Sequence, residues 1–317
     1  MKKIQIDFAP LEGITGYHLR QVHHSHFGDI DRYYIPFIQP KQHGHFSHRE
    51  AQDIQPQHNE GLVAIPQLLT NQAYDFLVTT EKLAALGYRQ VNLNLGCPAR
   101  TVVSKGRGAG QLADLGKLEA FLTEIFRYTP LPVSIKTRIG VEQIREYESL
   151  LALYCQFPLA ELIVHPRLQR EYYEGRPHRE VMEETLKQAP FPVCYNGDIV
   201  NLDGFYQLQS ALPALQRVMI GRGLLRRPAL AREILGGPAA TMAELKAYHD
   251  DLYQRYRGAF GAERVVLFKM KEFWTYQIQA FEEPKRMAKK LKKVQRLPVY
   301  EQIVEEVWEQ GTLVTAD

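Results

Sequence analysis

The sequence predicts a (β/α)8 barrel, also called a TIM barrel, followed by a small C-terminal helical domain. Short apolar runs rich in β-branched residues recur eight times in residues 1–240. Segments with helical periodicity separate these runs, and after Gly236-Gly237-Pro238 the pattern becomes almost entirely helical. Eight β–α repeats in a chain of this length are typical of an α/β protein with a closed parallel barrel.

The expected strands are short, and the segments between them have the spacing of amphipathic helices. Strands are expected at Ile4–Pro10, Asp31–Phe37, Leu62–Leu69, Gln90–Leu95, Pro132–Arg138, Glu161–His165, Pro192–Asn196 and Arg217–Ile220. Helices are expected, among other places, at Ala73–Leu86, Leu115–Tyr128, Ile144–Cys155, Arg179–Gln188 and Leu202–Gln209. A doubly wound sheet is the structural alternative, but it usually has fewer strands, and no GxGxxG motif follows the first strand.

The last part of the chain has a different pattern. Residues 241–317 are nearly all helix-periodic, with breaks near Gly258, Gly261, Pro284 and Pro298. We therefore expect two domains, a barrel over residues 1–240 and a small helical domain over residues 241–317.

The composition is that of an ordinary globular protein. Of the 317 residues, 45% are hydrophobic and 24% are charged, and the formal net charge is +3. This small positive charge neither requires nor excludes a nucleic-acid partner. The three cysteines, Cys97, Cys155 and Cys194, are too widely spaced for a disulfide framework or a CxxC metal site. A cytoplasmic location fits them best, and neither a signal peptide nor a membrane-spanning apolar stretch is apparent.

Polar residues follow the ends of the expected strands. They occur in Pro10-Leu11-Glu12, at Gln67, in Asn94-Leu95-Gly96-Cys97-Pro98, at Lys136 and His165, and in Asn196-Gly197-Asp198 and Gly221-Arg222-Gly223. Because the C-terminal ends of the strands form the active site of such barrels, these scattered residues are expected to converge in space.

The last two strands end in glycine turns that are typical of a phosphate site. Gly197 and Gly221 follow the seventh and eighth strands, and glycine allows backbone N–H groups to approach an anion closely. Arg222 would add a positive charge and a forked donor. The alternative is that these are two ordinary tight turns.

Lys136 is expected to point into the barrel, where an unpaired charge is costly, so it should face a polar or anionic ligand. A flavin is such a ligand, because a cation near its N1–C2=O edge stabilises the reduced ring. Gln67 and His165 could bind the same polar edge. Taken singly, each of the three could instead have a structural role.

Cys97 lies in a turn directly after the fourth strand, on the expected catalytic face. A free thiol has a pKa near 8.5, so it is mostly protonated at neutral pH and can act as an acid. The alternative is a small buried cysteine, which is what we expect of Cys155 and Cys194. The glycine-rich segment after this turn, residues 104–110, reads as a flexible lid.

Two other features carry weaker signals. Histidines cluster near the N-terminus, at His23, His24, His26, His43, His45 and His48, but no cysteine or carboxylate pattern completes a metal site, so no metal is expected. Residues 285–296 hold seven cations, Lys285, Arg286, Lys289, Lys290, Lys292, Lys293 and Arg296, and no acid. This segment suits contacts with a phosphate backbone, or it is a charged helix balanced by Glu301, Glu305, Glu306 and Glu309.

Seven short motifs occur in a fixed order along the chain. They are Ala9-Pro10-Leu11-Glu12-Gly13-Ile14-Thr15, Pro66-Gln67-Leu68-Leu69, Asn94-Leu95-Gly96-Cys97-Pro98, Val133-Ser134-Ile135-Lys136-Thr137-Arg138, Val164-His165-Pro166-Arg167, Asn196-Gly197-Asp198-Ile199 and Met219-Ile220-Gly221-Arg222-Gly223. Each is short, but their order and spacing together are specific. In this order the chain resembles the bacterial, FMN-dependent tRNA-dihydrouridine synthases over essentially its full length.

The resemblance implies a role for each matching residue. Cys97 corresponds to the general acid of the family, Asn94 to a residue that touches the flavin or the target base, and Arg167 to one near the substrate. The positions that correspond to flavin contacts are Pro10, Leu11, Glu12, Gln67, Lys136, His165, Asn196, Gly197, Asp198, Gly221 and Arg222. The helical domain would bind tRNA, with Lys285, Arg286, Lys289 and Lys290 as candidate contacts.

The chain departs from the family pattern at three places. Asn92 stands where an aspartate is expected, Leu11 replaces the usual methionine, and Pro166-Arg167-Leu168 replaces the usual Gly/Ala-Arg-Thr. The last departure bears on the substrate-side contacts. None of the three removes a residue that the chemistry requires.

The resemblance implies that FMN, reduced by NADPH or NADH, donates hydride to C6 of a tRNA uridine and that Cys97 protonates C5. It implies no membrane and no stable protein partner. The alternatives are an FMN barrel that acts on a free small molecule such as a pyrimidine, and an RNA-binding protein that keeps the barrel only as a scaffold. An isomerase or aldolase barrel is a more distant possibility. The sequence does not specify which uridine is modified.

Overall fold

A computed structural model describes residues 3–40 and 44–314. Eight parallel strands form a closed barrel in which each strand pairs with its neighbours in chain order and β1 pairs with β8. The strands are β1 (Gln5–Phe8), β2 (Arg32–Ile38), β3 (Ala64–Leu68), β4 (Val91–Leu95), β5 (Val133–Arg138), β6 (Glu161–His165), β7 (Val193–Asn196) and β8 (Arg217–Ile220). The predicted barrel is confirmed, and the closed strand order excludes the doubly wound alternative.

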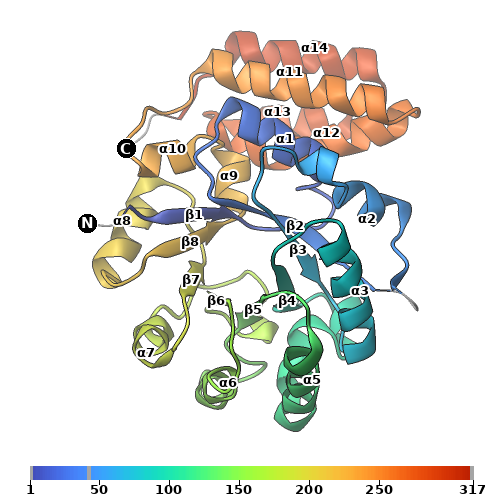
Figure 1. Cartoon of the computed structure of the whole chain (residues 1–317). Helices are drawn as coiled ribbons and strands as arrows, with labels where there is room; N and C mark the ends of the chain where they lie inside the picture. Colours follow the sequence, from blue (N-terminus) through green and yellow to red (C-terminus); the bar gives the residue numbers. More distant parts are fainter. Residues whose placement is uncertain (1–2, 41–43, 315–317) are drawn as a thin grey trace.

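Helices surround the barrel and continue beyond it (Figure 1). Those connecting the strands are α1 (Tyr17–His26), α2 (His48–Asp53), α3 (Ala73–Ala85), α4 (Arg100–Val103), α5 (Leu115–Tyr128), α6 (Glu146–Tyr154), α7 (Glu180–Gln188) and α8 (Leu202–Ala211). After β8 come α9 (Arg222–Arg226), α10 (Leu230–Ile234), α11 (Met242–Ala259), α12 (Glu263–Gln277), α13 (Pro284–Lys293) and α14 (Leu297–Gln310). None of the helices in these described ranges has the length and apolar character needed to span a membrane.

Local sequence explains where several helices begin. Thr241 accepts a hydrogen bond from the backbone N–H of Glu244, whose carboxylate bonds back to Thr241, so α11 starts with a capping box. Asp114 and Asn201 cap α5 and α8 without a capping box, each accepting from a backbone N–H three residues on. The capping box at Thr241 therefore marks where the short segment after β8 ends and the longer C-terminal helices begin.

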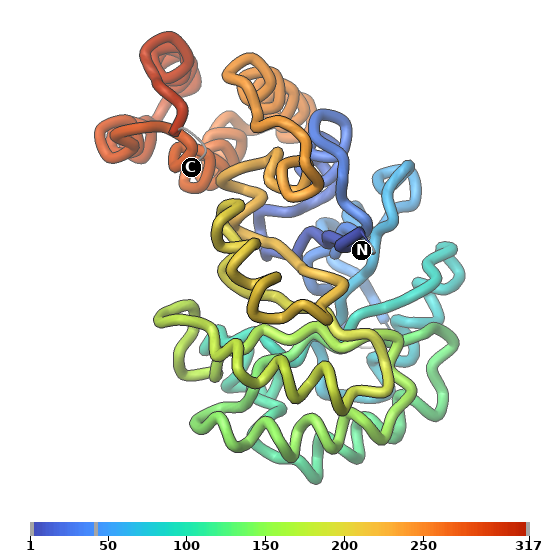
Figure 2. Tube along the Cα trace, turned by 90° about the vertical axis from the view of Figure 1, so that its left-hand side faces the viewer, coloured from blue at the N-terminus to red at the C-terminus, as the bar shows by residue number. Residues whose placement is uncertain are grey.

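The helices α11–α14 lie together on one side of the barrel, next to α1, as both views show (Figures 1 and 2). The ring of Tyr248 on α11 meets that of Phe27, at the end of α1, edge-on at 5.3 Å between centroids. On α12, the ammonium of Lys269 donates to the carbonyl of Gly13 in the loop after β1. The helices after residue 241 are therefore attached directly to a loop at the C-terminal ends of the strands.

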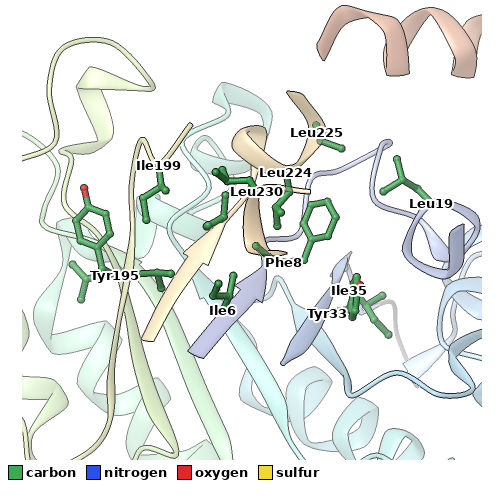
Figure 3. Packing of buried hydrophobic residues seen from close by; sticks show 14 of the residues in the cluster. Ile6, Phe8, Leu19, Tyr33, Ile35, Tyr195, Ile199, Leu224, Leu225 and Leu230 are labelled. Atoms are coloured by element: carbon green, nitrogen blue, oxygen red, sulfur yellow. The ribbon is translucent and has the colours of Figure 1, made fainter. Parts of the chain in front are cut away.

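The hydrophobic core lies mainly between the outer faces of the strands and the helices. Around β1, Ile6 and Phe8 pack against Leu224 and Leu230 from α9 and α10 (Figure 3). The same cluster continues into the helical segment, where Trp274 is buried. Because one apolar cluster spans both parts, the helices after residue 241 share a core with the barrel.

Inside the barrel the side chains form layers. At the N-terminal ends of the strands, Asp7 and Glu161 are buried between Arg32 and Arg217. The layer above is apolar and contains Ala9, Tyr34, Ile65, Ile163, Cys194 and Met219. Cys194 is buried as expected, whereas Cys155, at the end of α6, is only half-buried. Side chains therefore fill the barrel interior from the N-terminal ends of the strands upward, and the interior opens toward their C-terminal ends.

Candidate active site

A cavity of about 430 Å³ lies at the C-terminal ends of the strands. The predicted site residues that line it are Pro10, Leu11, Glu12, Gln67, Asn94, Cys97, Lys136, His165, Asn196, Gly197, Asp198, Gly221 and Arg222. They come from β1 and from every strand between β3 and β8, so the barrel brings together residues that are far apart in sequence. The cavity has the size of a site for a cofactor or a small ligand.

Lys136 on β5 lines the cavity without a partner of opposite charge. No hydrogen bond or ion pair is formed by its ammonium within residues 3–40 and 44–314. Burial, followed by the nearby charge of Arg138, lowers the pKa of Lys136 to about 8. An anionic ligand in the cavity would relieve both effects, so this donor set fits the anionic ring of a reduced flavin.

His165 is a neutral imidazole whose tautomer is fixed by Arg167. Burial, followed by the charge of Lys136, holds the pKa of His165 well below its ordinary value. The guanidinium of Arg167, which can only donate, lies 3.0 Å from Nε2 of His165. Nε2 must therefore accept, and the single ring proton is on Nδ1. His165 thus offers the cavity a neutral N–H donor.

Arg167 itself does not line the cavity. It is buried, and its other donors bond to the carbonyls of Glu174 and Gly175 and to Asp198. Asp198 also accepts from Arg222 at 2.7 Å, so one carboxylate holds two guanidinium groups. Burial opposes ionisation, but these hydrogen bonds and charges lower the pKa of Asp198 below its usual value. In this structure Arg167 positions its neighbours, and its role near the substrate stays a prediction.

Glycine is required around the end of β8. A Cβ on Gly223 would lie 2.1 Å from the carbonyl oxygen of Ile199, and one on Gly221 would lie 3.3 Å from Cβ of Ala9. Any side chain at Gly223 would push the turns after β7 and β8 apart, next to the guanidinium of Arg222. Closely packed glycine turns with an adjacent arginine are a donor set that fits a phosphate group.

Cys97 is half-buried at the cavity wall, in the turn after β4. Burial raises the pKa of the Cys97 thiol, although the N–H of Ala99 and the charges of Arg138 and Lys136 oppose this effect. The thiol is therefore protonated at neutral pH, as a general acid requires.

The glycine-rich segment after Cys97 differs from the predicted flexible lid. Residues 108–113 form a 3-10 helix, and Ala109 is buried with its N–H donating to the carbonyl of Cys97 at 3.0 Å. A Cβ on Gly108 would lie 2.8 Å from that same carbonyl oxygen. The glycines serve close packing against the Cys97 turn, which a pattern of glycines alone does not distinguish from a mobile loop.

Of the lining residues outside the predicted site, three have polar side chains, namely Arg138, Tyr173 and Tyr276. Arg138 donates to the carbonyls of Gly96, Leu168 and Tyr172, and so ties the Cys97 turn to the loop after β6. The ring of Tyr173 lies 5.4 Å from the guanidinium of Arg138 and 5.0 Å from that of Arg222. The two-residue period of β5 indicates that Arg138 shares the inner face with Lys136, whereas nothing local marks the tyrosines.

The predicted basic segment forms α13 and does not line the cavity. Lys285, Arg286 and Lys289 are exposed, and Lys290 pairs with Glu306 of α14. The helix therefore carries exposed cations that do not line the cavity, together with one that is partly neutralised.

The histidines do not form a metal site in the part of the chain that the structure describes. No group of three or more potential metal ligands is found there. His23 is a buried core residue that bonds to Tyr33 and to the carbonyl of Pro228, and His26 pairs with Asp251. His43 lies outside the described residues.

Comparison with known proteins identifies the family. A family model described as dihydrouridine synthase (Dus) matches residues 7–305. The chain belongs to the dihydrouridine synthase family. As a member of this family it is an enzyme, a flavin-dependent oxidoreductase.

Individual relatives agree with this assignment. The chain is 30% identical over 279 residues, 80% of this chain and 84% of the relative, to a protein named tRNA-dihydrouridine(16) synthase from Aquipseudomonas alcaligenes. It is 29% identical over 187 residues, 57% of this chain and 56% of the relative, to a probable tRNA-dihydrouridine synthase from Staphylococcus aureus. The second alignment thus spans about half of each protein.

Solved structures resemble this fold at low sequence identity. Morphinone reductase superposes with a TM-score of 0.51 and 12% identity, covering 75% of this chain and 87% of the reductase. Its complex with tetrahydroNAD gives the same score and identity, covering 74% and 87%. At this level of identity the likeness supports the barrel fold and nothing finer.

Proposed function

We propose that this enzyme reduces the C5–C6 double bond of a uridine in tRNA to give 5,6-dihydrouridine, with FMN as cofactor and NADPH, or alternatively NADH, as reductant. The observation that carries the proposal is the position of a protonated thiol, Cys97, on the wall of a cavity that holds the unpaired cation Lys136. Membership of the dihydrouridine synthase family supplies the reaction class.

The residues around the cavity suit FMN at both of its ends. Lys136 and the Nδ1–H of His165 would hold the polar edge of the ring system, and Arg222 with the glycine turns would hold the phosphate. Pro10, Leu11, Glu12, Asn196, Gly197 and Asp198 would complete the contacts. When bound, FMN supplies the hydride that is added to C6 of uracil.

Cys97 would supply the proton. As hydride arrives at C6, negative charge spreads toward C5 and the C4 carbonyl, and a neutral acid is needed at C5. Burial keeps the Cys97 thiol protonated at the pH of the cell, and the nearby charges of Lys136 and Arg138 would stabilise the thiolate that forms when the proton leaves.

Target recognition would involve both parts of the chain. A uridine must leave the RNA stack to reach the cavity, at a cost of roughly a few kcal/mol. Asn94 would contact the extruded base, while residues 241–317 would bind the tRNA backbone through Lys285, Arg286, Lys289 and Lys290 of α13. The relative that aligns over most of both chains is named for position 16, so uridine 16 is the first position to test.

The three cysteines are free in the structure, which fits a cytoplasmic enzyme that meets tRNA there.

The test combines a visible spectrum with a tRNA assay. We expect flavin absorption bands in the purified protein, and dihydrouridine in tRNA when NADPH is present. Cys97→Ala should retain flavin and NADPH oxidation but lose about 10²- to 10⁴-fold in product formation. The matched control is Cys155→Ala, which removes a half-buried thiol outside the cavity and should be as active as the wild type.

Three outcomes would count against the proposal. Wild-type rates from Cys97→Ala would refute the acid assignment. Reduction of free pyrimidines but not tRNA would favour a small-molecule dehydrogenase, and a colourless protein that takes up no added FMN would leave an RNA-binding scaffold.

A further inference from the structure

A continuous line of buried amide groups runs through the barrel beneath the Cys97 turn. The N–H groups of Gly96 and Cys97 donate to Oδ1 of Asn94, at 3.0 and 2.9 Å. Nδ2 of Asn94 donates to Oε1 of Gln67 at 2.8 Å, and Nε2 of Gln67 donates to Oδ1 of Asn92 at 2.7 Å. We call Asn92, Gln67 and Asn94 the amide relay.

The lower end of the relay is anchored by backbone. Nδ2 of Asn92 donates to the hydroxyl of Ser134 at 2.9 Å, and that hydroxyl donates to the carbonyl of Val91 at 3.3 Å. Asn92 and Ser134 are fully buried, and Gln67 and Asn94 are nearly so. The hydrogen bonds from Asn94 down to Val91 are therefore buried, where each one matters most, and those to the N–H groups of Gly96 and Cys97 are half-buried.

The groups at the two ends of the amide relay determine which atom donates in each of its hydrogen bonds. A backbone N–H at Cys97 can only donate, so Asn94 must present its oxygen to it and its nitrogen to Gln67. Gln67 and Asn92 must likewise each accept with the oxygen and donate with the nitrogen of the amide. At the lower end the carbonyl of Val91, which can only accept, receives the hydrogen bond of the Ser134 hydroxyl. If one amide were rotated by 180°, two donors or two acceptors would face each other at each side of it.

The relay leaves two hydrogens for a ligand. Gln67 and Asn94 each use one amide hydrogen within the relay, and within the described residues no acceptor is found for the other. Both residues line the cavity, whereas Asn92 lies in the layer beneath and does not. The orientation of the two cavity-lining amides thus depends on a residue that touches no ligand.

Asn94 also occupies two backbone donors of the Cys97 turn. Backbone N–H groups near a thiol favour the thiolate, and the N–H of Ala99 already acts on Cys97 in this sense. Because Asn94 engages the N–H groups of Gly96 and Cys97, they do not add to that effect.

We propose that Asn92 is a positioning residue, which acts through Gln67 and Asn94 to fix the Cys97 turn, to keep its backbone N–H groups away from the sulfur and to aim two amide hydrogens into the cavity. The inference rests on the proposed function for its catalytic meaning, but the relay itself is a property of the protein alone. Position 92 is also where this chain departs from the aspartate expected by family resemblance. An aspartate could accept from Gln67 equally well, and Ser134 would then rotate to donate to it, so the essential property of the position is an acceptor.

The test is alkylation of Cys97 by iodoacetamide across a pH range, resolved by mass spectrometry on the purified full-length enzyme. Asn92→Leu keeps the size but removes the acceptor, so we expect the midpoint for Cys97 to move down by about one pH unit. Asn92→Asp keeps the acceptor, and its midpoint should stay at or above that of the wild type because an added negative charge disfavours the thiolate. Cys155 in the same samples is the internal control and should react alike in all variants.

Turnover gives the second readout. In tRNA reduction, Asn92→Leu should lower kcat about tenfold with little change in KM for tRNA, and Asn92→Asp should restore it. An unchanged Cys97 midpoint in Asn92→Leu, or an equal downward shift in Asn92→Asp, would overturn the proposal. If Asn92→Leu does not fold, Ser134→Ala removes the next acceptor and should shift the midpoint in the same direction by less. If the wild type makes no dihydrouridine, the proposed function fails while the alkylation profiles still decide the role of Asn92.

Discussion

The two ends of the barrel both enclose charged side chains, but they balance them differently. At the N-terminal end, Asp7 and Glu161 face Arg32 and Arg217, with four contacts between 2.5 and 3.1 Å. At the C-terminal end, Lys136 projects into the cavity with no acid beside it in the described chain. One end is complete without a ligand, and the other has an uncompensated cation.

The difference shows how one kind of residue serves two purposes in the same barrel. Burial raises the pKa of Asp7, but Arg32 and Arg217 supply the hydrogen bonds and charges that oppose this. Burial lowers the pKa of Lys136, and here the next contribution, from Arg138, acts in the same direction. Charges that compensate each other hold the fold together, whereas a charge left uncompensated is available to a ligand.

The largest expected effect comes from breaking the balanced end. Arg32→Met would leave Asp7 and Glu161 with one arginine between them, and we expect the free energy of unfolding to fall by about 3–5 kcal/mol. Denaturant titration measures this loss. The matched control is Arg49→Met, which removes an exposed arginine paired with Glu12 and should cost about 1 kcal/mol or less. Equal losses in the two variants would show that the buried group contributes no more than a surface pair.

The second prediction concerns Arg167, which donates both to His165 and to Asp198 at the cavity. Arg167→Met removes the donor to Nε2 of His165 and one of the two partners of Asp198. We expect both tautomers of neutral His165 to be populated, and a loss of about 1–3 kcal/mol in unfolding free energy from the unpaired groups. Nitrogen-15 NMR of the imidazole reads the tautomer directly. A single unchanged tautomer would mean that the backbone around His165 fixes the ring without Arg167.

The sequence predicted the strands of the barrel and the residues that converge at their ends, because both depend on the periodicity of the chain. The strand ends differ from those expected by two residues or fewer, because apolar β-branched runs bounded by turn residues define a barrel strand well. The convergence of Cys97, Lys136 and His165 followed from the barrel alone. Contacts between loops did not follow, because the position of Tyr173 depends on Arg138 bonding to backbone carbonyls that only the folded chain brings near.

The amide relay was missed for a similar reason. Gln67 and Asn94 were recognised as separate candidates, but no pattern within β3 or β4 indicates that their side chains are linked through Asn92. Arg167 was placed near the substrate by motif, whereas its buried position depends on Asp198 and on the loop carbonyls of Glu174 and Gly175. A motif gives the residue type, and only the packing decides whether the side chain faces the cavity.

The third prediction extends the comparison to α13, where three cations are exposed and Lys290 is paired with Glu306. Lys285→Gln, Arg286→Gln and Lys289→Gln each remove an exposed cation, and each should weaken tRNA binding and reduce the slope of log affinity against log salt by about 0.7–0.9. Lys290→Gln should have a smaller effect, because Lys290 must first give up its ion pair with Glu306. Filter binding at several salt concentrations measures both quantities. Slopes that do not change would place the RNA on another surface.

The smallest expected effect is a gain in stability, opposite in sign to the loss expected for Arg32→Met. In the folded protein the pKa of Lys136 is lowered to about 8 from an ordinary 10.5, chiefly by burial. Between these two values the folded state binds fewer protons than the unfolded state, so this lysine's contribution to stability rises with pH and is least favourable below pH 8. Lys136→Met should therefore make the flavin-free enzyme more stable at pH 7, by about 0.5–2 kcal/mol, and weaken its affinity for flavin.

The pH dependence separates this explanation from improved packing. The stability difference between Lys136→Met and the wild type should shrink as pH rises from 8 toward 10.5, because the wild-type lysine loses its charge in that range. Thermal unfolding of both flavin-free proteins across this range measures the difference, and other titrating groups cancel in the comparison. A gain in stability that is independent of pH would mean that the methionine packs better and that the charge of Lys136 is already well solvated in the empty cavity. A loss of stability at pH 7 would show that contacts within the protein compensate the charge of Lys136, as the ion pairs at the N-terminal end compensate the charges there.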